Sequence, residues 1–269
     1  MDTVGFIGGG NMAEALINGI TSAKVYPPEN IVVSDVRPER LEYLKARFAV
    51  RTESDNASVS QAADILILSV KPQIMTEALN SIKGQLAPDA LVISIAAGMK
   101  TSKITSVLGQ IPIVRVMPNT PSLIGEGASA IYANDLAKPF LRKAERIFAA
   151  VGLAVFVEDE QLMDAVTAIS GSGPAYFFLL MEEMIKSAEQ MGLKSDIAKK
   201  LVLQTAKGAA MLSVEADKTG ESPAELRKKV TSPGGTTEAA ITFFNESKFG
   251  SIVTAAINKA AQRSRQLSK

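Results

Sequence analysis

The sequence contains no cysteine, no histidine and no tryptophan among its 269 residues. The absence of cysteine excludes disulfides and thiolate nucleophiles. Because both cysteine and histidine are absent, the usual zinc sites are excluded too. Catalytic triads with an imidazole base are excluded as well. We therefore expect no metal site, and any chemistry must use lysine, hydroxyl groups, carboxylates, backbone amides or a bound cofactor.

The chain also lacks an excess of charge of either sign and lacks long apolar runs. Its 29 basic and 28 acidic side chains leave a net charge of +1, which offers no electrostatic attraction to nucleic acid. The apolar runs are far shorter than the ~20 residues that span a bilayer, and the start of the chain does not resemble a signal peptide. We therefore expect a soluble, cytoplasmic protein that binds neither nucleic acid nor membrane.

Short apolar runs, several of them β-branched, alternate with helix-period stretches through the first part of the chain. The predicted strands are 3–7, 31–34, 65–70, 91–95, 113–116, 128–132 and 154–157, and the predicted helices are 11–22, 38–48, 74–84, 103–108 and 138–151. Nearly continuous apolar strands are typical of a parallel sheet that is covered on both faces. The alternation predicts a doubly wound, mostly parallel α/β Rossmann domain over residues 1–158.

After residue 158 only helical patterns remain. The predicted helices are 159–169, 174–191, 196–214, 223–230, 237–246 and 249–267. Pro174 and Pro223 suit first helical turns, and Ser222 with Glu225 has the form of a capping box. We expect an all-α domain over residues 159–269. Its many alanine, methionine and isoleucine residues indicate either an ordinary core or a surface that packs against a second subunit.

A glycine-rich turn lies between the first predicted strand and the first predicted helix. Gly8, Gly10 and Ala13 form the pattern G-x-G-x-x-A. The first glycine permits a tight turn, the second lets the backbone approach a pyrophosphate, and the alanine allows close packing of helix on strand. Free amides and the helix dipole then favour an anion. The context predicts a dinucleotide-binding turn.

The end of the second predicted strand leaves the form of the dinucleotide open. Asp35 is placed to accept hydrogen bonds from the ribose hydroxyls of NADH. Ser34, Arg37 and Arg40 are instead suited to hold the 2′-phosphate of NADPH.

The predicted strand ends supply further candidates. Pro72 holds Lys71 in an extended conformation, so this lysine lies either near a nicotinamide or in a solvated loop. Small residues at 94–98 would let a flat ring approach the next strand end. Asn119 is either a polar contact to a ligand or part of an Asn turn.

Two more glycine-rich segments lie in the helical part. The first, at residues 170–176, favours a closely packed helix entry. In the second, the amides around Gly234 and Gly235 predict an anion nest in front of a helix, with the hydroxyls of Thr236 and Thr237 beside it. This loop is either a site for a small carboxylate or a helix cap without a ligand.

These segments, taken in order, resemble the pyrroline-5-carboxylate reductase family. The matching stretches are GFIGGGNMAEA, LSVKPQ, SIAAG, VRVMPNTP, AISGSGPAYFF and VTSPGGTTEAAI, from residue 5 to residue 241. The resemblance implies an N-terminal Rossmann domain and a C-terminal helical dimerisation domain. It also implies a homodimer, and often a decameric ring of five such dimers. The implied activity is reduction of the cyclic imino acid Δ1-pyrroline-5-carboxylate to L-proline, the last step of proline biosynthesis, by NADPH or NADH.

The resemblance also implies roles for individual residues. The cofactor-binding residues are Gly8, Gly10, Asn11 and Met12 at the pyrophosphate, Ser34, Asn56 and the Arg37 predicted above at the adenosine half, and Ser69, Val70, Lys71, Pro72, Ala96 and Ala97 at the nicotinamide half. The substrate-binding residues are Ser232, Gly234, Gly235, Thr236 and Thr237. Thr237 would contact the ring nitrogen and Lys71 would assist at the nicotinamide. Asp35 departs from the family pattern and leaves the preference for NADPH open.

Two other functions are weighed against this one. A 3-hydroxyacid dehydrogenase would carry a catalytic lysine early in the helix that starts at Pro174, where residues 174–181 contain none. A non-catalytic NADP-binding regulator would not need a carboxylate loop such as residues 231–238.

Overall fold

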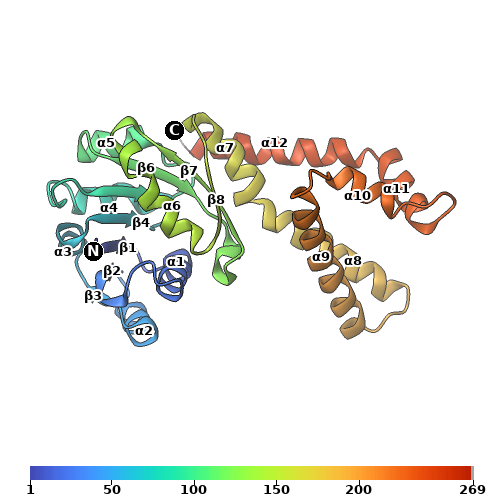
Figure 1. The fold of residues 1–269 in the computed structure, drawn as a ribbon, viewed down its shortest axis with the longest axis horizontal. Helices are drawn as coiled ribbons and strands as arrows, with labels where there is room; N and C mark the ends of the chain where they lie inside the picture. Colours follow the sequence, from blue (N-terminus) through green and yellow to red (C-terminus); the bar gives the residue numbers. More distant parts are fainter. Residues whose placement is uncertain (268–269) are drawn as a thin grey trace. The chain divides into compact units, whose positions relative to one another are not determined.

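The computed structural model describes residues 1–267, which form two compact units (Figure 1). The first unit comprises Met1–Pro174 and the C-terminal segment from Lys259, and the second comprises Ala175–Asn258. The sequence prediction placed the boundary between the two domains at residues 158 and 159. In the structure, the helical residues 159–174 and those from Lys259 onward belong to the first unit. The Ser264 hydroxyl donates to the Asp164 carboxylate at 2.6 Å, and Met163 and Ala168 are fully buried.

The first unit is built on one eight-stranded sheet with the order β3-β2-β1-β4-β5-β6-β7-β8. Its strands are β1 (Val4–Ile7), β2 (Ile31–Ser34), β3 (Arg51–Glu53), β4 (Ile65–Leu68), β5 (Leu91–Ser94), β6 (Ile113–Met117), β7 (Gly127–Ala133) and β8 (Gly152–Phe156). The first six strands are parallel, β7 is antiparallel to β6, and β8 is parallel to β7. The doubly wound, mostly parallel fold predicted from the sequence is confirmed.

Helices cover both faces of this sheet. They are α1 (Asn11–Ser22), α2 (Pro38–Phe48), α3 (Asn56–Ala62), α4 (Met75–Ser81), α5 (Thr101–Leu108), α6 (Leu141–Ala149) and α7 (Met163–Val166). Phe6, Leu16 and Phe148 belong to a buried cluster on one face, and Leu66 and Leu79 belong to a cluster on the other. Burial on both faces explains why the strands lack polar alternation.

One strand and one α-helix of the first unit have no counterpart in the sequence prediction. Strand β3 is a short polar edge strand, so it shows no apolar run. Helix α3 has only seven residues and begins where the Asp55 carboxylate accepts from the Ser58 amide at 3.0 Å. Both elements are too short to show a recognisable periodicity of apolar residues in the sequence.

The second unit is helical. It contains α9 (Ser195–Asp217), α10 (Pro223–Lys229), α11 (Thr236–Glu246) and most of α8 (Gly173–Gln190) and α12 (Phe249–Leu267). The predicted capping box at Ser222 and Glu225 is present. No helix in the described part of the chain is long and apolar enough to cross a membrane.

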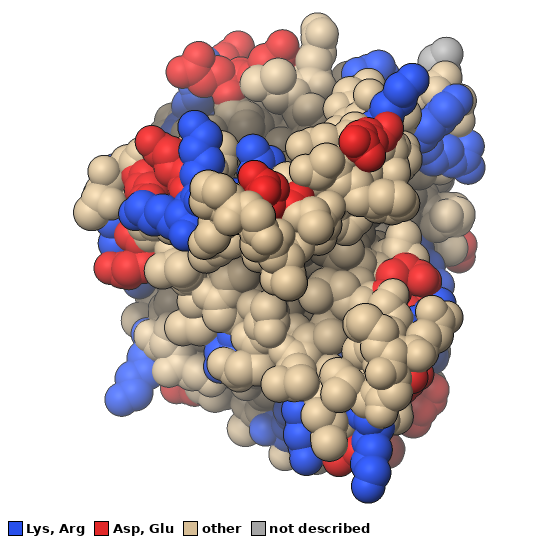
Figure 2. Space-filling model, turned by 90° about the vertical axis from the view of Figure 1, so that its right-hand side faces the viewer, with Lys and Arg blue, Asp and Glu red and all other residues tan. Residues whose placement is uncertain are grey.

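The second unit buries few of its own apolar side chains. Within Ala175–Asn258, the buried apolar residues are Ala188, Ala198 and Val202. Large apolar side chains stand exposed on every helix except α10, among them Phe177, Phe178, Leu201, Met211, Phe243 and Ile252. Figure 2 shows a face of the molecule on which uncharged residues cover most of the centre. Such a surface is typical of an interface between subunits.

Candidate active site

The predicted pyrophosphate turn joins β1 to α1. The Gly8 amide donates to the Ser34 carbonyl at 2.8 Å, which fixes the turn to the end of β2. Gly8 has a φ of +96°, and a Cβ there would lie 2.9 Å from Val70 Cγ1. This position therefore requires glycine both for its backbone conformation and for space.

The turn ends in an open helix N-terminus. Gly10 is the N-cap of α1, no side chain caps the helix, and the place of a Cβ on Gly10 has no atom within 4 Å. The first-turn amides, including those of Asn11 and Met12, point out of a helix of twelve residues. The side chain of Met12 packs against the core, so its backbone is the part that faces a ligand. Space and free amide donors together fit a dinucleotide pyrophosphate.

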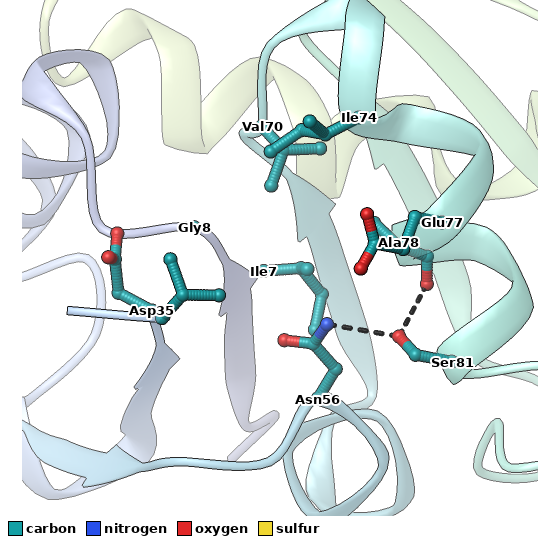
Figure 3. Close-up of a pocket in the computed structure, with 10 residues that line it drawn as sticks. Ile7, Gly8, Asp35, Asn56, Val70, Ile74, Glu77, Ala78 and Ser81 are labelled. Atoms are coloured by element: carbon teal, nitrogen blue, oxygen red, sulfur yellow. Dashed lines mark hydrogen bonds between the residues drawn. The ribbon is translucent and has the colours of Figure 1, made fainter.

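A chain of hydrogen bonds links the predicted adenosine-side residues. The buried Ser34 hydroxyl donates to Asn56 Oδ1 at 2.7 Å. The Asn56 amide donates to the Ser81 hydroxyl at 3.0 Å, and this hydroxyl donates to the Ala78 carbonyl at 2.8 Å (Figure 3). Sequence reasoning missed Ser81, because nothing local marks a serine that only the sheet topology brings beside Asn56.

A cavity of about 160 Å³ adjoins this chain of hydrogen bonds (Figure 3). It is lined by Ile7, Gly8, Asp35, Val36, Asn56, Val70, Ile74, Glu77, Ala78 and Ser81. The lining joins the carboxyl ends of β1, β2 and β4, where open α/β sheets bind ligands. Its mostly apolar walls and the 91% exposed Val36 suit the flat base and ribose of an adenosine. The cavity thus collects three of the predicted cofactor residues, Gly8, Asn56 and Val70.

Asp35 is hydrogen-bonded to the turn and to Arg37. It accepts from the Gly9 amide at 2.8 Å and forms an ion pair with Arg37 at 3.0 Å. Burial alone raises the pKa of Asp35, but hydrogen bonds from Arg37 and Gly9 outweigh it and lower the pKa below its ordinary value. Asp35 is therefore a carboxylate at neutral pH, and its charge is compensated.

The predicted nicotinamide-side residues lie at the ends of β4 and β5. The Ser69 hydroxyl donates to the Gly8 carbonyl at 2.6 Å and to the Ile7 carbonyl at 3.0 Å, which ties β4 to the turn. Lys71 is exposed and extended (φ −64°, ψ 147°), the conformation expected before Pro72. Ala96 is buried and Ala97 is half-buried directly after β5. Small or extended residues thus line both strand ends.

The structure assigns packing roles to two other candidates. Asn119 is neither free nor in an Asn turn, since its Oδ1 accepts from the Ala128 amide at 2.8 Å and its amide donates to the Ser170 carbonyl at 3.1 Å. A Cβ on Gly171 would lie 2.5 Å from Met117 Cε. The close packing predicted for residues 170–176 is therefore present at Gly171, whereas the place of a Cβ on Gly173 has no atom within 4 Å.

The predicted substrate loop lies in the second unit, in front of α11. Ser232 to Gly235 form a tight turn, with the Gly235 amide donating to the Ser232 carbonyl at 3.0 Å and a φ of +70° at Gly234. The Gly234 amide donates to the Glu238 carboxylate at 2.7 Å. Both glycine amides thus have acceptors within the protein, and that of Gly234 is itself a carboxylate, on α11. The binding of a ligand carboxylate by this loop stays a prediction.

The donors left at this loop belong to the start of α11. Gly235 is the N-cap of this helix and no side chain caps it. The amides of Thr236 and Thr237 therefore lie in an uncapped first turn, beside their own hydroxyls. A helix N-terminus of this kind favours a carboxylate.

Comparison with known proteins identifies a family model in each part of the chain and relatives along its whole length. A family model described as pyrroline-5-carboxylate reductase dimerisation matches residues 160–267, and one described as NADP oxidoreductase, coenzyme F420-dependent, matches residues 3–98. The pyrroline-5-carboxylate reductase of Pseudomonas aeruginosa is 44% identical over 268 residues, which cover 99% of this chain and 97% of that protein.

Solved structures agree. A pyrroline-5-carboxylate reductase from Coxiella burnetii matches with a TM-score of 0.92 and 39% identity, covering 100% of this chain and 99% of that one. The Plasmodium falciparum pyrroline carboxylate reductase, solved with NADP bound, matches with a TM-score of 0.88 and 31% identity over 100% of this chain and 98% of that one. The chain belongs to the pyrroline-5-carboxylate reductase family of oxidoreductases and carries that family's dimerisation domain.

Proposed function

We propose that this chain reduces Δ1-pyrroline-5-carboxylate to L-proline, the last step of proline biosynthesis, with NADPH as the hydride donor. When bound, NADPH supplies the hydride for the imine carbon. The observation that carries the proposal is the open glycine turn in front of α1, in a chain that matches these reductases over 99% of its length. NADH is the second cofactor that the turn would accept, because the pyrophosphate is common to both.

The first unit would hold the dinucleotide. Gly8, Gly10 and the amides of Asn11 and Met12 would bind the pyrophosphate. Ser34, Arg37 and Asn56 would face the adenosine half. The remaining residues, at the nicotinamide half, are Ser69, Val70, Lys71, Pro72, Ala96 and Ala97. The Lys71 ammonium would stand beside the nicotinamide and add positive charge there.

The loop before α11 would hold the substrate. The first-turn amides and the Thr236 hydroxyl would bind its carboxylate, while Ser232, Gly234 and Gly235 shape the turn. Access to the Gly234 amide requires displacement of the Glu238 carboxylate. The Thr237 hydroxyl would contact the ring nitrogen, since a hydroxyl both donates and accepts as an imine becomes an amine. An iminium carbon is already electrophilic, so a chain without histidine suffices for the reaction.

The exposed apolar helices of the second unit would form a homodimer, and five dimers would form the decamer that the resemblance implies. Mass measurement distinguishes these assemblies, at two or ten times the 28.5 kDa of one chain. A cytoplasmic location fits a biosynthetic enzyme of this kind.

The decisive experiment follows the absorbance of NADPH when Δ1-pyrroline-5-carboxylate is added. We expect consumption of NADPH with formation of proline, and none with a 3-hydroxyacid and NADP⁺. Thr237→Ala should lower kcat about tenfold or more if its hydrogen bond strengthens in the transition state. Thr237→Ser keeps the hydroxyl and should recover most of the rate, and Thr254→Ala on α12 is the control. Absence of proline formation would overturn the function, and full turnover by Thr237→Ala would overturn the role of Thr237.

A further inference from the structure

The carboxylate of Asp35 has no vacant acceptor position. Oδ2 accepts from the Gly9 amide at 2.8 Å and from Arg37 Nη2 at 3.2 Å. Oδ1 accepts from the Arg37 amide and from Arg37 Nε, both at 3.0 Å. An ionised carboxylate offers about four lone-pair positions, so these four donors fill it. A ribose hydroxyl could bind Asp35 only after the Arg37 side chain had moved away.

The hydrogen bond to Gly9 places Asp35 in the pyrophosphate turn itself. Gly9 lies between the two motif glycines, and its carbonyl accepts from Arg40 Nε. A Cβ on Gly9 would lie 2.8 Å from Leu44 Cδ1. The Gly9 residue is thus held at its amide by Asp35 and at its carbonyl by Arg40, and Leu44 leaves no room for a side chain on it. Because the next residue is Gly10, these contacts fix the direction of the open N-terminus of α1.

Arg40 and Arg37 differ in how much of the side chain remains accessible to a ligand. Arg40 also donates to the Glu14 carboxylate at 2.5 Å, and its side chain is 16% exposed. The Arg37 side chain is 54% exposed and has Asp35 as its ion-pair partner. Arg37 is therefore the cation at this strand end that remains open to an incoming phosphate.

We propose that Asp35 is a positioning residue for the pyrophosphate turn and that Arg37 determines which dinucleotide the chain prefers. Arg37 occupies the positions on Asp35 that a ribose diol would use, and its charge offsets the repulsion between Asp35 and a 2′-phosphate. The acidic residue that commonly selects NADH therefore does not select it in this chain. The inference rests on the proposed function only in that the turn must bind a dinucleotide.

The test measures the binding of NADPH and of NADH by nicotinamide fluorescence, without any imine substrate. In Asp35→Asn, the side-chain NH2 group faces two of the four donors in either orientation of the amide. The substitution therefore breaks the contact with Gly9 or the contact with the Arg37 amide and Nε. We expect both dissociation constants to rise, that of NADH by about tenfold, the scale of one lost hydrogen bond to a charged group. The constant of NADPH should rise less, because the substitution also removes the negative charge that repels a 2′-phosphate and leaves Arg37 uncompensated.

Arg37→Met should behave differently, because it leaves the Gly9 hydrogen bond in place and exposes the Asp35 carboxylate. NADPH binding should weaken and NADH binding should hold or strengthen, moving the ratio about tenfold toward NADH. Arg142→Met is the matched control, since Arg142 is an exposed arginine paired with Glu145 on α6. It should change neither constant.

Arg40→Met acts on the same residue, Gly9, from its carbonyl side and should raise both constants in parallel. It therefore tests the positioning role even if Asp35→Asn fails to fold. The proposal is overturned if Asp35→Asn weakens NADH alone or changes neither constant. It is also overturned if Arg37→Met leaves the ratio unchanged. Because binding is measured without the imine, dinucleotide binding without proline formation would overturn the proposed function and leave this inference standing.

Discussion

At the scale of single residues, two glycines in one turn lack a side chain for different reasons. Gly8 is confined by its φ of +96° and by Val70, whose Cγ1 would lie 2.9 Å from a Cβ. Gly10 has ordinary backbone angles (φ −66°, ψ −176°) and no atom within 4 Å of a Cβ. Gly8 is thus required by the fold, whereas a side chain on Gly10 would occupy only the space reserved for a ligand.

Alanine substitution should separate these two reasons. Gly8→Ala should lower the free energy of unfolding by about 1–3 kcal/mol, the cost of an unfavourable backbone conformation, and should also weaken NADPH binding. Gly10→Ala should leave stability within about 0.5 kcal/mol, as a strain-free surface change does, and weaken NADPH binding strongly. Urea unfolding and fluorescence titration measure the two quantities. Equal loss of stability in both variants would contradict the distinction.

Whether a residue's role could be predicted depends on whether its motif or contact is local in the sequence. Gly8 and Gly10 could be predicted because the motif that contains them is local. The contact of Ser81 with Asn56 and that of Asp35 with Gly9 could not, because each joins separate elements. The sequence prediction left the Gly234 amide free for a ligand, whereas in the structure this amide donates to the carboxylate of Glu238, four residues ahead.

At the scale of elements, a small charge cluster joins α1 to α2. Glu14 on α1 accepts from Arg40 at 2.5 Å, from the Tyr43 hydroxyl at 2.9 Å and from Arg47 at 3.1 Å, all three on α2. Burial by itself raises the pKa of Glu14, but the bonds from Arg40 and Tyr43 outweigh it and lower the pKa below its ordinary value. The cluster therefore stabilises the junction while Glu14 is ionised.

Glu14→Gln should destabilise this junction in a pH-dependent way. At pH 7 we expect a loss of about 1–2 kcal/mol in the free energy of unfolding, the scale of a lost charge-assisted hydrogen bond. Because the pKa of Glu14 is lowered in the folded state, its contribution is fully present above its unfolded pKa of about 4.3 and is lost as the pH falls through the folded value. Urea unfolding from pH 7 to pH 3 should show the two proteins converge. A constant difference would argue against the ion pairs.

Most elements could be predicted, and the exceptions have physical causes. Helices α1, α2 and α12 have the bounds that were predicted, since their periodicity and termini are strong. The orientation of β7 was not predicted, because an apolar strand has the same composition in either direction. The helix predicted at 138–151 begins as a 3-10 helix, Asp135–Phe140, that contains Pro139.

At the scale of the whole molecule, the second unit needs a partner for its apolar surface. Phe177 is 64% exposed and Phe243 is 68% exposed, while Ala188, Ala198 and Val202 are its buried apolar residues. So small a core rarely supports a helical unit of this size. The sequence left open whether these side chains form a core or an interface, because both are apolar, and the match to a dimerisation domain favours an interface.

A subunit interface of this kind should make stability depend on protein concentration. We expect the Tm to fall on dilution, since dissociation accompanies unfolding. Phe177→Asp should lower the Tm further and shift the mass in solution toward one chain. Leu136→Asp, at a 47% exposed apolar residue of the first unit, should leave the mass unchanged. A Tm independent of concentration, with the mass of a single chain, would contradict the proposed dimer.

The return of α12 to the first unit has a consequence for synthesis on the ribosome. Leu267 Cβ would lie 3.0 Å from a Cβ on Gly98, and Ala261 and Ser264 are buried in the same unit. Domains made early in translation commonly fold before the rest of the chain appears. Here the first unit lacks part of its packing surface until the residues from Lys259 onward have been made, so it cannot be completed before the whole second unit has been synthesised.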